Sequence, residues 1–129
     1  MNRNAILIDE GIHGTVKIYV DADNADTIFS YVFRDKVDEE FKEIRALLKQ
    51  TLRNREKYCK CDVSDRAKNM FEMRFTRNLR NDRIYCKEIS TGKVRHIVMI
   101  ELLEKKKTQQ IDKTTKRRIE KMGGYIYDI

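Results

Sequence analysis

Basic side chains at strand-like spacing are the residues of this sequence whose types suggest chemistry. Arg83, Tyr85 and Lys87 occupy alternate positions, so a strand would direct all three to the same face of a sheet. Arg74 has an equivalent outward position in the preceding run, and three consecutive lysines follow the next run: Lys105, Lys106 and Lys107. We expect an open cationic sheet face carrying an aromatic ring, which suits a single-stranded backbone whose bases can stack. The routine outward residues of a half-solvated sheet would produce the same pattern.

The positive charge is concentrated in the second half of the chain. The 129 residues carry a formal net charge of +7. Residues 1–65 hold 11 Lys and Arg against 13 Asp and Glu, a net of −2, whereas residues 66–129 hold 17 against 8, a net of +9. This asymmetry predicts a polyanion-binding face in the second half, to which Arg77 and Arg80 also belong. Solvated surface lysines are the alternative explanation.

Other kinds of catalytic or metal site are not supported by residue spacing. The sequence contains no Gly-rich phosphate loop, no paired carboxylates and no His-based triad. The histidines, His13 and His96, are isolated, and the spacing of Cys59, Cys61 and Cys86 is not that of a zinc site. We therefore expect no metal, no small-molecule cofactor and reduced thiols, with any charge stabilisation supplied by Arg and Lys.

The first half of the chain predicts strands followed by helices. Ala5 to Ile8 and the alternating run Val16 to Val20 indicate an opening hairpin or a single first strand. Apolar residues of the segment from Ile28 to Phe33 are spaced for one helical face, although their branched and aromatic side chains would also suit a strand. A long amphipathic helix should then begin near Val37 and end near Glu56, and the segment from Tyr58 to Asn69 should be a loop.

The second half predicts a three-stranded meander and a final helix. Phe71, Met73 and Phe75 alternate with charged residues, and Ile84 and Cys86 should face inward in the second strand. Val94 to Leu103 is apolar on both faces, as a central strand should be. A basic helix from Asp112 to Gly123 follows, and Tyr125 to Ile129 forms a short strand or docked tail. The fold class is α+β, and we expect residues 1–129 to form a single domain.

Four motifs in this order resemble the RelE/ParE toxin superfamily, and most closely its HigB-like, phage-derived branch. They are Phe71-Glu72-Met73-Arg74-Phe75, Asp82-Arg83-Ile84-Tyr85, the apolar strand, and Lys106-Lys107-Thr108-Gln109 before a basic helix. The likeness covers roughly residues 37–122. It implies a RelE-like fold: a small antiparallel sheet, mostly the C-terminal meander, packed on N-terminal helices and followed by a C-terminal helix.

The resemblance also implies an activity and roles for single residues. Such toxins of type II toxin-antitoxin systems enter the ribosomal A site and cleave mRNA, because the ribose 2′-hydroxyl attacks the adjacent phosphate. Arg83 corresponds to the phosphate-stabilising arginine, Arg74 to a phosphate-binding position, and Lys106 and Lys107 to the rim of the site, with Lys105 as a further candidate. The remaining RNA-binding candidates are Arg77, Arg80, Tyr85 and Lys87. The residue that transfers the proton is not assigned, and the candidates are Tyr85, Glu101, Tyr125 and Tyr127.

Partners and location follow from the same resemblance and from composition. The expected partners are a cognate antitoxin protein and mRNA on the ribosome. No run approaches the roughly 18 apolar residues of a membrane span, so we expect a soluble cytoplasmic protein without membrane contact. Two other functions remain open: a gyrase poison like the ParE branch, and a non-catalytic module that binds RNA or a partner through the same face.

Overall fold

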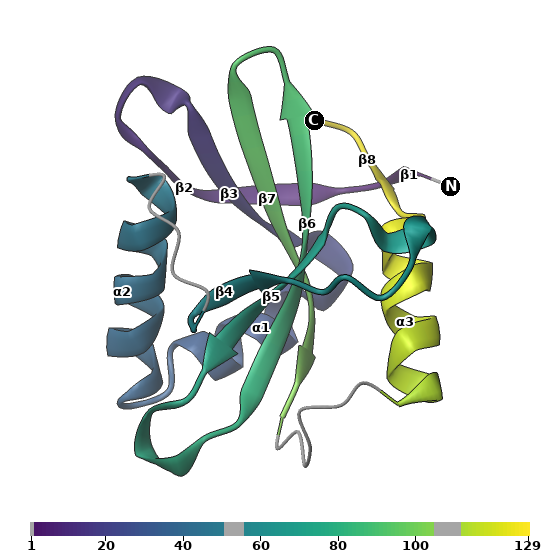
Figure 1. Cartoon of the computed structure of the whole chain (residues 1–129). Helices are drawn as coiled ribbons and strands as arrows, with labels where there is room; N and C mark the ends of the chain where they lie inside the picture. Colours follow the sequence, from purple (N-terminus) through teal and green to yellow (C-terminus); the bar gives the residue numbers. More distant parts are fainter. Residues whose placement is uncertain (1, 51–55, 105–111) are drawn as a thin grey trace.

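A six-stranded, mostly antiparallel sheet with helices on both faces forms the centre of the protein (Figure 1). The structure is a computed structural model that describes residues 2–50, 56–104 and 112–129. The strand order is β2-β3-β7-β6-β5-β4, and a separate parallel pair joins β1 to β8. The strands are β1 Asn2–Arg3, β2 Ala5–Glu10, β3 Val16–Asp21, β4 Tyr58–Lys60, β5 Met70–Phe75, β6 Asp82–Thr91, β7 Val94–Leu103 and β8 Ile126–Tyr127. The predicted α+β class is confirmed.

The chain opens with a hairpin that joins β2 to β3. The sequence pattern allowed either a hairpin or a single first strand, and the structure has the hairpin. Its turn uses Gly14 at a φ of 65°, a left-handed conformation that glycine adopts without a Cβ clash. On its other side β3 pairs in parallel with β7, so Ile18 lies beside Ile97. The N-terminal hairpin therefore extends the meander into one continuous sheet, which the sequence pattern did not predict.

Two helices, α1 (Ala25–Val32) and α2 (Val37–Lys49), cover one face of the sheet. The amphipathic spacing of α2 buries Phe41, Ile44 and Leu48 against the inward residues of the strands. Asp38, Glu39 and Glu40 occupy its first turn, where carboxylates complement the helix dipole. The predicted end near Glu56 is wrong, because α2 ends at Lys49. Residues 51–55 of that predicted helix lie outside the described residues.

The meander of β5, β6 and β7 forms as predicted. Met73 pairs with Ile84, and Ile84 and Cys86 face the core beneath α1 and α2. The prediction of a loop from Tyr58 to Asn69 is wrong in part, because Tyr58–Lys60 forms β4 at the edge of the sheet. A strand of three residues is too short to show a period of two in the sequence.

The second face of the sheet is covered as well, which corrects the expectation of an open face. Helix α3 (Lys113–Gly123) packs its buried residues Ile119 and Met122 against Val98 and Ile100 of β7. Figure 1 shows α3 and α2 on opposite sides of the sheet. Gly123 permits close packing, because a Cβ there would lie 2.6 Å from the Arg66 carbonyl oxygen. The narrow apolar stripe of α3 is thus sufficient to close this face.

None of the helices described by the structure is long and apolar enough to cross a membrane.

Candidate functional site

Four side chains from two neighbouring strands gather on the α3 side of the sheet. Arg74 on β5 pairs with Arg83 on β6, and Glu72 pairs with Tyr85 one step along the same face. Directly opposed residues of an antiparallel pair have adjacent side chains, so the four form a compact group. We call Glu72, Arg74, Arg83 and Tyr85 the Arg74 cluster. It lies toward the end of β7, because Arg83 also pairs with Leu103.

Arg83 is enclosed rather than exposed. Its side chain is 1% exposed, and its Nε lies 3.6 Å from Oε2 of Glu72. A terminal nitrogen of Arg83 donates a hydrogen bond to the Asp82 carbonyl at 3.3 Å, while Nε has no hydrogen-bond partner among the described residues. The expectation that Arg83 projects from an open face is therefore wrong. A buried guanidinium must be compensated, and Glu72 supplies the opposite charge.

Arg74 is the member of the cluster that reaches solvent. Its side chain is 26% exposed, and Oε1 of Glu72 accepts two hydrogen bonds from its guanidinium, at 3.0 Å and 2.7 Å. Burial alone would lower the pKa of Arg74, but the hydrogen bonds and charge of Glu72 outweigh it and raise the pKa above its usual value. Arg74 therefore stays cationic and lies between solvent and the buried carboxylate.

Tyr85 is buried beside Glu72 and keeps its proton. Burial raises the pKa of Tyr85 well above that of a free phenol, and the charge of Glu72 adds to the shift. Its hydroxyl has no hydrogen-bond partner among residues 2–50, 56–104 and 112–129. A protonated phenol can donate one hydrogen bond, so Tyr85 provides an unused donor inside the cluster.

Glu72 is the central residue of the cluster, and sequence reasoning missed its importance. The side chain is 4% exposed, faces Arg83 as well as Arg74, and accepts a hydrogen bond from Sγ of Cys59 at 3.6 Å. Burial raises the pKa of the Cys59 thiol, with the charge of Glu72 adding to it, so the thiol remains a donor. The alternation of β5 already placed Glu72 on the same face as Arg74. That shared face was the available signal.

Two of the other predicted site residues, Arg77 and Arg80, do not join this cluster. Arg77 and Arg80 lie in the turn between β5 and β6, where Arg77 forms an ion pair with Glu43 of α2 on the opposite side of the sheet. Arg80 donates to the Arg77 carbonyl at 3.4 Å. The predicted lysines of the rim, Lys105, Lys106 and Lys107, lie outside the described residues.

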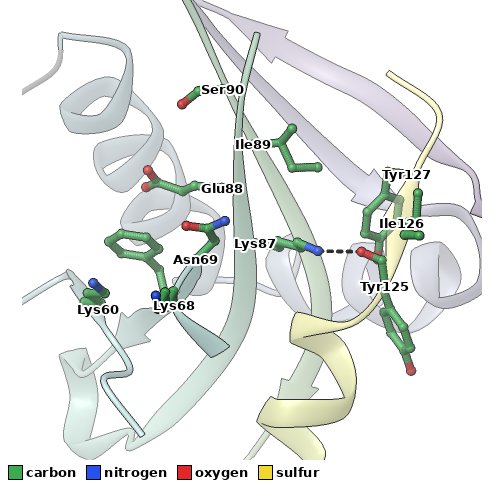
Figure 2. Close-up of a pocket in the computed structure, with 11 residues that line it drawn as sticks. Lys60, Lys68, Asn69, Lys87, Glu88, Ile89, Ser90, Tyr125, Ile126 and Tyr127 are labelled. Atoms are coloured by element: carbon green, nitrogen blue, oxygen red, sulfur yellow. Dashed lines mark hydrogen bonds between the residues drawn. The ribbon is translucent and has the colours of Figure 1, made fainter. Parts of the chain in front are cut away.

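Lys87 is also held by backbone groups instead of lying on an open surface. Its Nζ donates to the carbonyl of Gly123 at 2.9 Å and to that of Tyr125 at 2.5 Å, and burial lowers its pKa. Figure 2 shows the hydrogen bond from Lys87 to Tyr125, which attaches the C-terminal segment to β6. Lys87 therefore lies on the predicted face of β6, but the expectation that this face is open at Lys87 is wrong. The predicted short strand or docked tail exists, because β8 pairs with β1.

The remaining candidates for proton transfer differ in the residues that they contact. Glu101 forms an ion pair with Arg118 of α3 at 2.6 Å, and both side chains are partly exposed. The Tyr127 hydroxyl donates to buried Asp21 at 2.6 Å and has a structural role there. Tyr125 stacks against the guanidinium of Arg3 at 4.2 Å. Tyr85 belongs to the Arg74 cluster, and Glu101 lies beside it, because Tyr85 pairs with Glu101 across β6 and β7.

A groove of about 630 Å³ lies beside the second half of β6 (Figure 2). Its basic side chains are Lys60, Lys68 and Lys87, and its other wall includes Tyr125 and Ile126. Lys87 pairs with Met70 and lies two residues along β6 from Tyr85, so the groove begins about 7 Å from the nearest member of the Arg74 cluster.

Within the part of the chain that the structure describes, no group of three or more His, Cys, Asp or Glu side chains could hold a metal ion. Comparison of the chain with protein-family models, with curated proteins and with solved structures finds no match.

Proposed function

We propose that this protein has a RelE-like fold and is the toxin of a type II toxin-antitoxin system, a ribosome-dependent mRNA endonuclease. The observation that carries the proposal is the Arg74 cluster: two guanidinium groups, a carboxylate and a protonated phenol on adjacent strands. Cleavage of a phosphodiester by its own 2′-hydroxyl requires a proton acceptor, charge stabilisation at the phosphate and a proton for the leaving oxygen. The cluster contains one group suited to each task.

The proposed roles follow from the exposure of each side chain. Arg74, the exposed member, binds the scissile phosphate, and Arg83 adds positive charge from beneath it. Glu72 takes the proton of the 2′-hydroxyl as the 2′-oxygen attacks phosphorus and the bond to the 5′-oxygen breaks. Tyr85 donates a proton to that 5′-oxygen. The products are a 2′,3′-cyclic phosphate and a free 5′-hydroxyl, and no redox step occurs.

We expect the proposed site to open when Arg74 exchanges one anionic partner, Glu72, for another, the RNA phosphate. Arg74 is held over Glu72 by two hydrogen bonds, so the carboxylate is covered in the free protein. A phosphate offers Arg74 a bidentate partner of equal or greater charge. When Arg74 transfers to the phosphate, Glu72 becomes accessible to the adjacent ribose. Binding of RNA thereby assembles the proton acceptor and the phosphate at the same position.

A non-catalytic binding module of the same fold is the second candidate, and one observation favours it. Arg83 is buried and faces Glu72, so its charge is balanced inside the protein. An arginine of this kind can serve to hold the sheet together while Arg74 and neighbouring cations bind RNA or a protein partner. In this case the cluster would bind an anion but would not break a phosphodiester bond.

The experiment that tests the proposal is incubation of the protein with ribosomes carrying a defined mRNA and with the same mRNA alone. The proposal expects cleavage on the ribosome, with a cyclic phosphate on the upstream fragment and a 5′-hydroxyl on the downstream fragment. Intact mRNA on ribosomes that nevertheless bind the protein would contradict cleavage and support the binding module. Fragments with other ends would exclude the proposed chemistry.

A further inference from the structure

The groove beside β6 contains an unpaired strand edge. The register of β5 with β6 ends where Met70 pairs with Lys87, and the backbone N–H of Glu88 then donates to the Asn69 carbonyl at 2.9 Å. β6 continues to Thr91 beyond this point. Among the described residues, no strand pairs with Ile89, Ser90 or Thr91 on the β5 side. The groove therefore lies along an open sheet edge.

The direction of the backbone groups in this part of β6 follows from strand geometry. Since the Glu88 N–H points toward β5, the Ser90 N–H, two residues on, points the same way. Figure 2 shows the side chains of Glu88 and Ser90 leaving β6 on one side and those of Lys87 and Ile89 on the other. The Ser90 backbone therefore faces into the groove, available for a further strand.

The walls of the groove define the chemistry of an incoming strand. Lys60 and Lys68 are exposed and form no ion pair among the described residues, whereas Glu88 is occupied by Arg95 at 2.5 Å and by the Tyr58 hydroxyl at 2.6 Å. The opposite wall is the segment Tyr125–Tyr127, held in place by Lys87. The groove thus combines unpaired positive charge with an apolar and aromatic wall.

We infer that this groove binds an extended, acidic segment of a partner protein, which adds to the sheet beside β6 in line with β5. Strand addition uses backbone hydrogen bonds for affinity and alternate side chains for selectivity. The acidic side chains on one side of the segment meet Lys60 and Lys68, and alternate apolar residues meet Tyr125 and Ile126. The inference does not depend on the nuclease proposal, because none of these residues belongs to the Arg74 cluster.

The test begins with selection of random displayed octapeptides on the wild-type protein. Counter-selection uses the double variant Lys60→Glu/Lys68→Glu, and the matched control is Lys42→Glu/Lys116→Glu, which makes the same charge change at exposed positions on α2 and α3. We expect acidic, alternating peptides that bind wild type and control, with at least tenfold weaker binding to the first variant. Absence of such peptides, or equal binding to both variants, would overturn the inference.

A second experiment, which blocks backbone hydrogen bonds of the peptide, distinguishes strand addition from binding by charge attraction alone. The best selected peptide is synthesised twice, with N-methyl groups on its odd-numbered or its even-numbered residues. Only one of these sets can face β6, so one version should lose binding at least tenfold and the other should retain it. The Ser90 amide should also gain protection from hydrogen exchange on binding. Equal binding of both versions would exclude strand addition.

The competing occupant is a single-stranded RNA, and the same assay identifies it. An octauridylate is titrated against the complex of protein and selected peptide, and peptide release is followed by fluorescence anisotropy. We expect no displacement at concentrations that saturate the Arg74 cluster. Release of the peptide from wild type, together with direct octauridylate binding that is weaker in Lys60→Glu/Lys68→Glu and unchanged in the control variant, would assign the groove to nucleic acid and overturn the protein-partner inference.

Discussion

Arg83 Nε lies 3.6 Å from Glu72 Oε2, with the two side chains 1% and 4% exposed. This buried pair differs from a surface salt bridge, because water cannot solvate the remaining charge if its partner is removed. Arg74 binds the other carboxylate oxygen of the same glutamate. Glu72 thus balances a structural arginine on one side and a solvent-facing arginine on the other.

Removal of the Glu72 carboxylate should destabilise the protein strongly. In Glu72→Ala, Arg83 remains buried without an opposite charge, and we expect unfolding free energy to fall by about 3–5 kcal/mol. The measurement is urea unfolding followed by circular dichroism. The double variant Glu72→Ala/Arg83→Met removes both charges and should recover more than half of the loss. Additive losses from the two single changes would show that the pair is not coupled.

Stability in acid should depend on Asp21. Burial alone would raise the pKa of this carboxyl, but hydrogen bonds from Arg3, Tyr127 and the Asp23 N–H lower it below its usual value. A lowered folded-state pKa contributes stability that is complete above the unfolded pKa of about 3.9 and is lost as pH falls through the folded pKa. Asp21→Asn should therefore cost about 2 kcal/mol at neutral pH and progressively less below about pH 4.

Urea unfolding at a series of pH values measures the difference in unfolding free energy between wild type and Asp21→Asn. A constant difference between Asp21→Asn and wild type across the acid range would contradict the assigned pKa direction.

Because α3 packs closely against the segment before β5, alanine substitution should have different effects on stability at two adjacent glycines. A Cβ at Gly123 would lie 2.6 Å from the Arg66 carbonyl oxygen, whereas a Cβ at Gly124 would lie 3.4 Å from its nearest neighbour, the Lys121 carbonyl oxygen. Gly123→Ala should lower the melting temperature, with a loss of about 1–3 kcal/mol, and Gly124→Ala should have a smaller effect. Equal melting temperatures for the two variants would contradict the described approach of α3.

Salt dependence measures whether Arg74 contacts RNA phosphate. Each phosphate neutralised on a single strand contributes about −0.7 to the slope of log affinity against log salt. For an octauridylate, Arg74→Ala should make the slope less steep by about 0.7, whereas Lys42→Ala on α2 should leave it unchanged. Fluorescence anisotropy at several salt concentrations gives both slopes. An unchanged slope in Arg74→Ala would remove Arg74 from the RNA-binding surface.

Much of the fold follows from local patterns in the sequence. Alternation in β5 and β6 predicted which face Ile84 and Cys86 occupy, and three- and four-residue spacing predicted the buried stripe of α2. These patterns depend on neighbours in sequence, so one chain is sufficient to reveal them. The parallel pairing of β3 with β7 depends on contacts between distant segments, and no local pattern encodes it.

The site was harder to predict than the fold, because burial depends on what covers each face. Arg83 and Tyr85 have the outward positions that the alternation of β6 gave them, but Ile119 and Met122 of α3 close the same face. A basic helix with two buried apolar residues resembles a solvated helix in sequence. The enclosure of Arg83, and with it the importance of Glu72, depends on contacts in the folded protein that no local pattern in the sequence encodes.

The central claim is that the Arg74 cluster cleaves RNA, and the most direct measurement is the single-turnover cleavage rate of mRNA on programmed ribosomes. Wild type and the control Lys42→Ala should cleave equally. Arg74→Ala, which removes the solvent-facing phosphate ligand, should be slower by about a hundredfold or more at saturating protein. Wild-type protein that leaves the mRNA intact, or an Arg74→Ala variant that cleaves at the wild-type rate, would contradict the claim.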